Sequence, residues 1–410
     1  MNIRFASIII LAAFLCTLTS KSFQAAALHS EQLLPPQSFE STAYSEVKSI
    51  PYITLSNGST QSDNGVSKIR YWPDNEWRSS SPEEQGMDSA KLAGMFREIK
   101  NKSYEVHSAL IIRNGYMVTE AYFQPYDKNT KHEIYSCTKS ITSAVFGIAM
   151  KEGYIKSTDQ KVLDLFTEYK IRNKDSYKKK LTLKHLLMLT PGTYYRDIDN
   201  MFEHLPNNYV SEYLDLKLIR EPGKTFVYDS FASHMLSAVI QKTTKTTTLE
   251  YARKKLFNPL GISDINWPSD PQGISLGGWG IQMLPEDMAK FGYLFLRKGL
   301  WNGKQIIPSK WIEESTKKQI STPAQYPVSG GYGYQFWINN KFDGYRADGG
   351  GGQMIYILPK YDMVIVFTGA WGNVESTSVI SKFVVPAVKS NKALPANKQA
   401  YDELKAPIEE

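Results

Sequence analysis

Two strongly patterned β-hairpins near opposite ends of the chain constrain its fold most. The first joins residues 109–113 to 116–122 through Asn114-Gly115, a dipeptide that favours a type I′ turn. The second joins residues 354–358 to 363–367 through a four-residue turn. Because the sequence between the hairpins is largely of helical or irregular pattern, we expect an α+β protein. An antiparallel β-sheet assembled from both ends of the chain would be flanked by helices and would carry an inserted, mostly helical domain.

This pattern predicts the domain boundaries. Residues 76–154 and 275–390 form the sheet domain, and residues 155–274 form the helical domain. Residues 28–75 are rich in Ser, Pro, Gln and Asn and are predicted to be a polar N-terminal arm. Residues 391–410 are expected to be a loose polar tail.

Residues 1–27 have the pattern of a secretory signal peptide. Arg4 precedes an apolar run at 5–18, and Ala25-Ala26-Ala27 provides a cleavage site of small residues. The run is too short to cross a bilayer, and a lipoprotein signal centred on Cys16 is weak because a bulky residue precedes the cysteine. We expect a periplasmic or secreted protein without stable membrane insertion after signal removal.

Composition argues against several functions. The net charge is +7, and removing Arg4 and Lys21 with the signal leaves +5. The basic residues are scattered, so nucleic acid is not an expected partner. Loss of Cys16 leaves Cys137 alone, which excludes an intrachain disulfide and a cysteine-based metal site. The six histidines show no paired metal-ligand spacing, and we expect no metal and no cofactor.

The most chemically suggestive segment is Ser136-Cys137-Thr138-Lys139, a Ser-x-x-Lys pattern that opens an apolar helix. Apolar residues recur at helical spacing across 141–149, and Gly153 ends the run. Ser136 and Lys139 therefore share one face, a single turn apart. A serine needs a base to become a nucleophile, and a lysine can be that base only if its pKa falls by roughly 3 units, which burial favours. Serine is also a favoured helix N-cap, and that interpretation is about equally good for the segment alone.

Three other Ser-x-x-Lys patterns lack this context. Ser45 lies in the polar N-terminal stretch. Ser176 lies within the basic run 174–180, whose repelling ammonium groups predict solvated surface. Ser315 is expected on the exposed side of a helix. Ser136 is therefore the preferred nucleophile.

Two further segments could complete a site. Tyr228 follows a turn at 221–224 and begins a helix; a tyrosine beside a lysine can share its proton and serve as an acid and a base. A buried structural tyrosine is the commoner role among 25 tyrosines. Residues 347–353 place four consecutive glycines before a strand, where backbone N–H groups could point at an oxyanion. A flexible loop or a bulge is the alternative.

The order of these segments resembles the serine β-lactamase-like superfamily, in the branch of class C β-lactamases, esterases and 6-aminohexanoate-dimer hydrolases. The resemblance covers roughly residues 77–385. Besides Ser136-x-x-Lys139 and Tyr228, it rests on residues 81–87, 181–187, 190–192, 222–223, 283–292, 301–304 and 351–353. It implies a β-lactamase/transpeptidase-like fold.

The resemblance also implies a role for each matching residue. Ser136 would be the acylated nucleophile, Lys139 its proton acceptor, and Tyr228 the tyrosine of the second family motif. The backbone N–H groups of Ser136 and Gly350 would form the oxyanion hole. The loop that binds the oxyanion and the substrate would include Asp348, Gly349 and Gly350. Ser230, from the second motif, would also contact the substrate.

Two departures from the family pattern affect the expected substrate. Ser230 replaces the Asn of the usual Tyr-x-Asn. The third motif, usually Lys-Thr-Gly or His-x-Gly, aligns with Ala347-Asp348-Gly349 or one residue later, and neither register supplies a cation for a penicillin carboxylate. Arg346 is a candidate substitute. We therefore expect less efficient β-lactamase activity than esterase or amidase activity.

The expected function is that of a secreted or periplasmic serine hydrolase, acting through an acyl-enzyme on an ester or a short amide. The substrate would be a small molecule or a short peptide. The alternatives are a β-lactamase, a D-Ala-D-Ala peptidase, or a catalytically silent protein with a penicillin-binding-like fold.

Two other motif matches are rejected. Ser62-Asp63-Asn64 spells a class A β-lactamase motif, but it precedes Ser136, whereas that motif must follow the nucleophile. Residues 273–277 spell a nucleophile elbow around Ser275. That mechanism needs a later histidine, and the last histidine of the chain is His234.

Overall fold

The computed structural model describes residues 72–73, 76–326, 329–339 and 341–409. The predicted signal peptide, Ser45 and Ser62-Asp63-Asn64 lie outside the described residues. Pro73–Glu410 form one compact unit.

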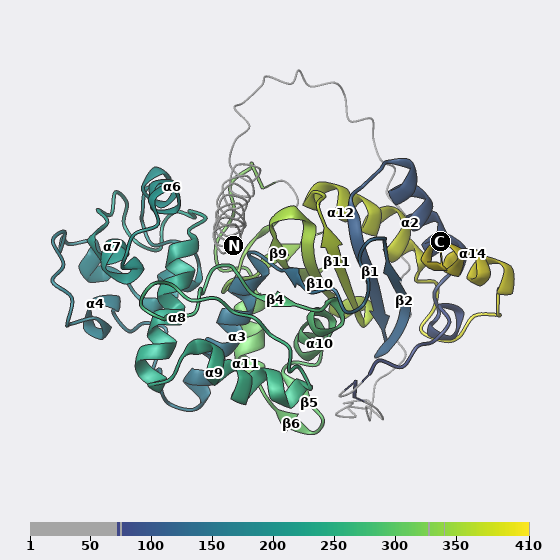
Figure 1. The fold of residues 1–410 in the computed structure, drawn as a ribbon, viewed down its shortest axis with the longest axis horizontal. Coiled ribbons are helices and arrows are strands. Elements are labelled where there is room, and N and C mark those ends of the chain that lie inside the picture. Colours follow the sequence, from purple (N-terminus) through teal and green to yellow (C-terminus); the bar gives the residue numbers. More distant parts are fainter. Residues whose placement is uncertain (1–71, 74–75, 327–328, 340, 410) are drawn as a thin grey trace, which may run out of the picture. The chain divides into compact units, whose positions relative to one another are not determined.

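A seven-stranded antiparallel sheet, in the order β2-β1-β11-β10-β9-β8-β7, forms the centre of this unit (Figure 1). Its strands are β1 (Val106–Arg113), β2 (Tyr116–Tyr122), β7 (Gly331–Tyr332), β8 (Trp337–Asn339), β9 (Gly344–Gly349), β10 (Gln353–Leu358) and β11 (Met363–Gly369). β1 pairs with β11, so the first and last strands of the chain are neighbours. The predicted α+β fold, with its sheet built from both ends of the chain, is confirmed.

The turn between β1 and β2 has the predicted chemistry. Asn114 has φ 52° and Gly115 has φ 86°. Two consecutive positive φ angles are the requirement of a type I′ turn, and Asn and Gly tolerate them best. This turn sets the register in which Arg113 faces Tyr116 and Ile112 faces Met117; the register then shifts by one residue before Ile111, which faces Thr119.

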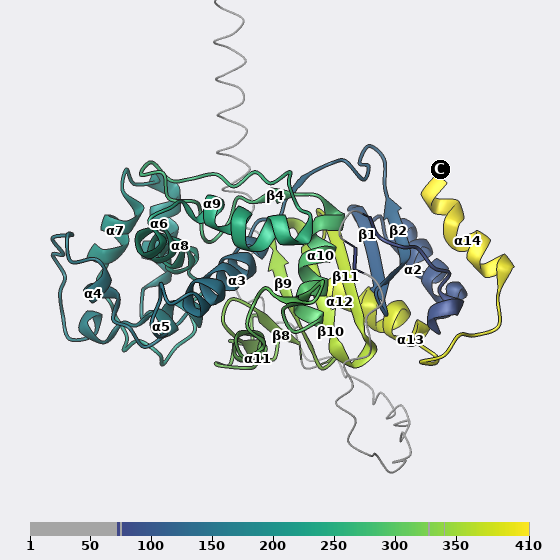
Figure 2. The same cartoon turned by 90° about the horizontal axis from the view of Figure 1, so that it is seen from below.

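Helices cover both faces of the sheet, as the side chains of β10 show. On one face, α10 (Pro285–Leu296) packs so closely that a Cβ on Gly292 would meet Ile355 at 2.8 Å. On the other face, the Tyr356 hydroxyl lies 3.0 Å from Ser376 Oγ in α12 (Asn373–Val379). α2 (Ser89–Asn101) also buries its apolar residues on this second face, in one cluster with Tyr356 (Figure 2).

The helical part of the chain lies beside the sheet, and α3 (Cys137–Lys151) lies between the two in both views (Figures 1 and 2). Its helices are α4 (Val162–Leu165), α5 (Leu183–Leu187), α6 (Tyr195–His204), α7 (Tyr209–Asp215), α8 (Ser230–Thr244) and α9 (Thr248–Ala252). Every residue of α3 up to Ala149 is buried, and apart from Lys139 these residues are apolar or small on all sides of the helix.

The remaining short elements connect these parts. β3 (His132–Glu133) pairs with β4 (Gln282–Met283), β5 (Leu300–Trp301) pairs with β6 (Lys304–Gln305), and α11 (Ser309–Thr316) follows. After α12, a π-helical turn (Ile380–Val384) leads to α13 (Val385–Ala387) and α14 (Lys398–Glu409). Among the described residues, no helix has the length and apolar character that a membrane span requires.

Three expectations about exposure are wrong. The basic run 174–180 is not entirely solvated: Lys178 is 1% exposed, and its Nζ donates to the carbonyls of Leu214 and Leu216 at the end of α7. Ser315 is fully buried in α11. The tail expected to be loose includes α14, whose Leu404 is 2% exposed and joins the core cluster of α2. In each case a tertiary contact overrides a polar local sequence.

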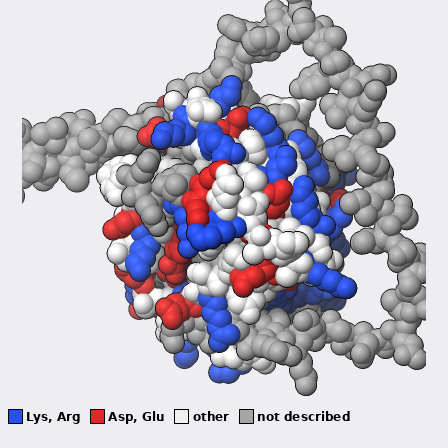
Figure 3. All heavy atoms as spheres, turned by 90° about the vertical axis from the view of Figure 1, so that its right-hand side faces the viewer, with Lys and Arg blue, Asp and Glu red and all other residues white. Residues whose placement is uncertain are grey.

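Surface charge is mixed on the side of the molecule that carries α2 and α14 (Figure 3). Ion pairs there include Arg97 with Glu403 at 3.5 Å and Lys398 with Asp402 at 2.5 Å. Lysine and arginine side chains are interspersed with carboxylates on this face, so it presents no uniform field of one sign.

Candidate active site

Ser136 stands at the start of α3, where the backbone makes an abrupt change of direction. The strand β3 precedes it, and the N–H of Ile134 donates to Ile281 O at 2.8 Å. Tyr135 has φ 43°, a left-handed conformation that is uncommon for a residue with a side chain and costs about 1–3 kcal/mol. Ser136 then enters the helical region at φ −69° as the N-cap. Backbone strain next to Ser136 indicates that the position of this residue is imposed by the surrounding fold.

Lys139 lies one helical turn after Ser136 and is directed at it. Its Nζ donates to Ser136 Oγ at 2.8 Å and to the carbonyl of Gly278 at 2.9 Å. The side chain is 1% exposed. The same Nζ lies 4.6 Å from the centroid of the Tyr228 ring. The three residues expected to carry the chemistry are therefore together.

Tyr228 is held in place by Trp337 and by the start of α8, the helix that follows it. Its ring stacks on Trp337 of β8, with centroids 5.7 Å apart and an interplanar angle of 20°. The next residue, Asp229, is the N-cap of α8 and accepts a hydrogen bond from Ala232 N at 2.8 Å. Burial raises the pKa of Asp229 to about 6.

Asp229 also accepts hydrogen bonds from two side chains. Thr193 Oγ1 donates at 2.9 Å and the Tyr213 hydroxyl at 3.0 Å, both to Oδ2. The carboxyl group thus ties the start of α8 to α7 and to the segment before α6. This network fixes the backbone from which the Tyr228 ring extends.

The glycine segment 349–352 lies close to Ser136 at the end of β9. A Cβ on Gly349 would meet Ile134 O at 2.3 Å and Ser136 N at 3.2 Å, so only glycine fits this contact. Gly350–Gly352 then forms a tight turn in which Gly351 and Gly352 have φ 73° and 86°. The turn is attached to α3 because Cys137 Sγ donates to Gln353 O at 3.2 Å.

Asp348 is neutralised by an internal partner. Arg346 Nε lies 2.9 Å from Asp348 Oδ2, and the two side chains are 1% and 9% exposed. Trp337 and Tyr356 are the cross-strand partners of Arg346, and its guanidinium lies 5.8 and 5.7 Å from their ring centroids. Because neighbouring strand residues face opposite sides, Arg346 and Asp348 share a face that is opposite to that of Gly349.

Ala347 shares the face of Gly349 and is 1% exposed. If the third family motif aligns with Ala347-Asp348-Gly349, the position of its Lys or His therefore carries a methyl group. Arg346, the candidate substitute, is paired with Asp348 on the face of the sheet that also carries Trp337, the stacking partner of Tyr228. The charge of Arg346 is thus compensated by Asp348, and Ala347 adds no charge.

Ser230 packs against the backbone that holds Lys139. It is 6% exposed, and a Cβ on Gly278 would meet Ser230 O at 2.5 Å and Ser230 Cβ at 3.2 Å. Sequence reasoning missed Gly278, because a backbone carbonyl acceptor 139 residues away from Lys139 has no motif of its own. The adjacent Gly277-Gly278 pair was the available signal for a close backbone approach.

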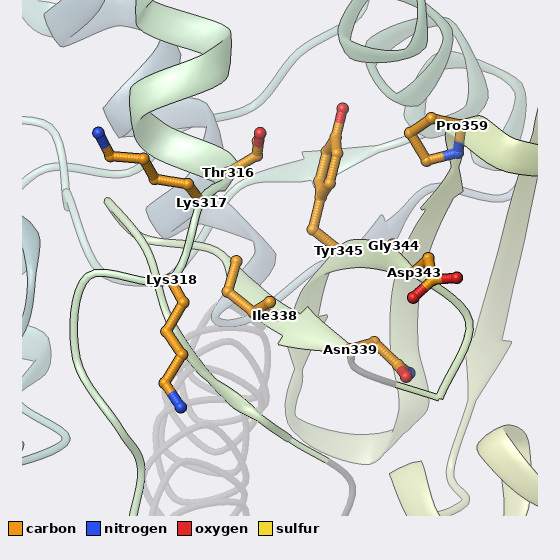
Figure 4. Close-up of a pocket in the computed structure, with 9 residues that line it drawn as sticks. All are labelled: Thr316, Lys317, Lys318, Ile338, Asn339, Asp343, Gly344, Tyr345 and Pro359. Atoms are coloured by element: carbon orange, nitrogen blue, oxygen red, sulfur yellow. The ribbon is translucent and has the colours of Figure 1, made fainter.

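Other features of the chain do not join this site. Ser275 of the rejected nucleophile elbow is 2% exposed, and its Oγ accepts from Leu249 N at 3.1 Å. A hollow of about 320 Å³ lies at the start of β9, lined also by β8 and by the end of α11 (Figure 4). This is the opposite end of the strand from Gly349. Within the described part of the chain, no three His, Cys, Asp or Glu side chains are grouped to hold a metal ion.

Comparison with known proteins supports the fold and the class of chemistry. The sequence model of the Beta-lactamase family matches residues 83–373. The chain is 23% identical over 286 residues to the 6-aminohexanoate-dimer hydrolase of Paenarthrobacter ureafaciens, covering 64% of this chain and 72% of that protein.

Two solved structures illustrate the shared fold. A Bacillus anthracis protein assigned as a 6-aminohexanoate-dimer hydrolase has a TM-score of 0.64 and 22% identity, covering 80% of this chain and 91% of that one. A family VIII carboxylesterase has a TM-score of 0.58 and 17% identity, covering 75% of this chain and 98% of that one. At these identities the two structures establish the similarity of fold.

Proposed function

Because the chain belongs to the Beta-lactamase family of serine β-lactamase-like hydrolases, we propose that it is a serine hydrolase that forms an acyl-enzyme with an ester or a short amide. The observation that carries this proposal is the 2.8 Å contact between the buried Lys139 Nζ and the Oγ of the partly exposed Ser136. Burial favours the neutral form of an amine, and a neutral amine can accept the serine proton.

In the acylation step, Ser136 Oγ forms a bond to the substrate carbonyl carbon while its proton passes to the neutral Lys139 amine. The carbonyl electrons move onto oxygen, and the resulting oxyanion accepts hydrogen bonds from the N–H groups of Ser136 and Gly350. The intermediate then expels the alcohol or amine, which takes the proton back from Lys139 through the Tyr228 hydroxyl. The product of this step is an ester on Ser136.

In the second step, water attacks the acyl-enzyme and restores Ser136. The same Lys139 and Tyr228 groups would accept the proton of the water and return it to the departing serine oxygen. Every proton that leaves a nucleophile in this scheme is returned to a leaving group, and no external acid or base is consumed.

In this family a cation of the third motif would bind a carboxylate of the substrate. The charges at residues 346–348 support a substrate that has no carboxylate to place there. Ala347 presents a methyl group where a cation would be required, and the charge of Arg346 is already paired with Asp348. The relatives named as a 6-aminohexanoate-dimer hydrolase and a carboxylesterase are consistent with amide or ester bonds. We also propose export to the periplasm or the exterior, on the pattern of residues 1–27 alone.

Parallel assays on one protein preparation test this function. The panel contains p-nitrophenyl esters, a 6-aminohexanoate dimer, nitrocefin and a D-Ala-D-Ala peptide, each with wild type and with Ser136→Ala. Turnover of an ester or of the dimer that disappears in Ser136→Ala supports the proposal. Turnover confined to nitrocefin or to the D-Ala-D-Ala peptide replaces the substrate assignment. Saturable binding without turnover of any compound indicates a catalytically silent protein.

A further inference from the structure

The segment from Asp270 to Gly278 runs along α8 and ends at the carbonyl that contacts Lys139. Glycine at positions 277 and 278 allows this close packing. A Cβ on Gly277 would meet Ser233 O at 2.4 Å, and a Cβ on Gly278 would meet Ser230 O at 2.5 Å. From the other side, Thr142 Oγ1 of α3 donates to Gly277 O at 2.8 Å. The segment is therefore held between α8 and α3, and a shift of the segment would move Gly278 O relative to Lys139 Nζ.

A buried histidine and aspartate hold both ends of this segment. His234 of α8 and Asp270 are each 0% exposed, with Nε2 and Oδ2 3.0 Å apart. The N–H of Gly277 donates to His234 Nδ1 at 3.4 Å. Asp270 Oδ1 accepts from the N–H groups of Gln272 and Ile274, each at 2.9 Å.

These partners define which ring nitrogen carries the proton. Gly277 N–H is a donor, so Nδ1 must present its lone pair, and the proton of the neutral ring must be on Nε2. Nε2–H then donates to Asp270 Oδ2. The opposite tautomer would place two N–H groups against each other at Gly277. The aspartate therefore sets the tautomer, and the tautomer sets the hydrogen bond to the residue before Gly278.

We propose that Asp270 and His234 are positioning residues, which hold the Gly278 carbonyl against Lys139 Nζ. This inference rests on the proposed role of Lys139 as the proton acceptor of Ser136. A neutral amine has two N–H bonds and one lone pair. When one N–H of Lys139 donates to Gly278 O, the amine cannot rotate freely and its lone pair is held in one direction. If that direction is toward the Ser136 hydroxyl, proton transfer occurs more often from a productive geometry.

Two substitutions at His234 separate its two hydrogen bonds. Asn places its side-chain oxygen where Nδ1 lies, so His234→Asn keeps an acceptor for Gly277 N–H but loses the hydrogen bond to Asp270. Gln places its amide nitrogen where Nε2 lies, so His234→Gln keeps the hydrogen bond to Asp270 but loses the acceptor for Gly277 N–H. If the hydrogen bond to Gly277 positions the carbonyl, His234→Gln is the more damaging of the two.

Asp270→Asn tests the tautomer with almost no change of shape. Two backbone N–H groups already require an oxygen acceptor on one side of residue 270, so the amide nitrogen of an asparagine would face His234. That nitrogen is a donor, and it would turn His234 Nε2 into an acceptor and move the ring proton to Nδ1, toward Gly277 N–H. Asp270→Asn should therefore behave like His234→Gln.

The readout is the rate constant of labelling by a fluorophosphonate as a function of pH. We expect His234→Gln and Asp270→Asn to be labelled about tenfold to a hundredfold more slowly than wild type, and His234→Asn to be labelled faster than His234→Gln. The acidic limb of the pH profile should move to lower pH in the two slow variants, because an acceptor that favours the charged amine is weakened. Tyr228, the titratable side chain whose ring lies beside Nζ, is unchanged in all of them.

Ser237→Ala is the matched control. Ser237 Oγ donates to Ser275 O at 2.6 Å, which fastens the same segment to α8, and it also lies 2.9 Å from Thr248 Oγ1. The part of Ser237 that neighbours Gly277 is its Cβ, which alanine keeps. A general loosening of the segment should lower the melting temperature of Ser237→Ala without moving its pH profile. A change in its profile equal to that of His234→Gln would overturn the positioning role, as would wild-type rates and profiles in both slow variants.

Failure of this inference and failure of the proposed function give different results. If wild type is labelled at Ser136 and the His234 and Asp270 variants match it, the positioning role is wrong and the hydrolase proposal stands. If wild type itself is not labelled, the proposed chemistry is wrong and the positioning role is lost with it.

Discussion

Lys139 Nζ lies 2.8 Å from Ser136 Oγ, one helical turn along α3, with the lysine side chain 1% exposed. An ordinary helix N-cap has no need of a buried amine, because its hydroxyl serves the free N–H groups of the first turn. Ser136 makes no such side-chain cap bond in this structure. The geometry therefore favours the chemical interpretation of the Ser-x-x-Lys pattern over the capping one.

Lys139→Arg should abolish turnover and covalent labelling while the protein remains folded. Arginine keeps a cation at this position, but its guanidinium does not lose a proton in proteins and so cannot act as the base. Loss of a general base costs about 10²–10⁴ in rate. Steady-state assays and melting curves measure the two effects. An arginine variant with more than a tenth of wild-type kcat would contradict the role of Lys139.

Tyr228→Phe removes a hydroxyl and keeps the ring that packs on Trp337. If the hydroxyl carries the proton to the leaving group, kcat should fall by about 10²-fold or more, with a smaller change in KM. The loss should be larger for an amide than for a p-nitrophenyl ester, because nitrophenolate leaves without protonation. Equal losses on both substrates would contradict the role of the Tyr228 hydroxyl as the acid that protonates the leaving group.

Gly349→Ala should disrupt the nucleophile itself. The added methyl would meet Ile134 O at 2.3 Å and Ser136 N at 3.2 Å, so the backbone on one side of the site must move. Displacing one oxyanion donor costs about 10²–10³ in kcat. Gly372→Ala is the control, because its Cβ would meet the end of the flexible Glu375 side chain. Similar activity of the two variants would contradict the close approach at Gly349.

The pH dependence of stability should include a contribution from Asp229. Burial raises its pKa from an ordinary value of 3.8 to about 6. The folded state therefore retains this proton over a range where the unfolded chain has lost it. The resulting stability is fully present below 3.8 and is lost as the pH rises through about 6, for a total of about 3 kcal/mol.

Asp229→Asn removes this titration while it keeps an oxygen to cap α8. The free energy of unfolding of the variant, measured relative to wild type by urea titration, should rise between pH 4 and pH 6, the window set by the pKa of Asp229. A relative stability that stays constant or falls over this range would show that Asp229 is ionised in the folded protein throughout.

The sequence predicts the parts of this fold that depend on local pattern. The Asn114-Gly115 turn, the β10–β11 hairpin and the apolar helix after Ser136 each have a period or a dipeptide that favours one structure. Their pairing into one sheet follows because neither hairpin can bury its apolar face alone. The order of motifs along the chain identified the family.

What the sequence does not predict is set by contacts between distant segments. The acceptor for Lys139 is a backbone carbonyl at Gly278, which any residue would provide, so no residue type marks it. Lys178 is buried because the end of α7 offers it two carbonyls, although its neighbours in the basic run are exposed. Arg346 has the charge to replace a missing cation, but its guanidinium is paired with Asp348, a contact that the motif pattern does not reveal.

The most direct test of the account is the mass of the protein after reaction with a fluorophosphonate, followed by peptide mapping. We predict a single adduct on Ser136 in wild type and none in Ser136→Ala or Lys139→Arg. An adduct on another residue, or equal labelling of Ser136→Ala, would contradict the assignment of Ser136 as the nucleophile.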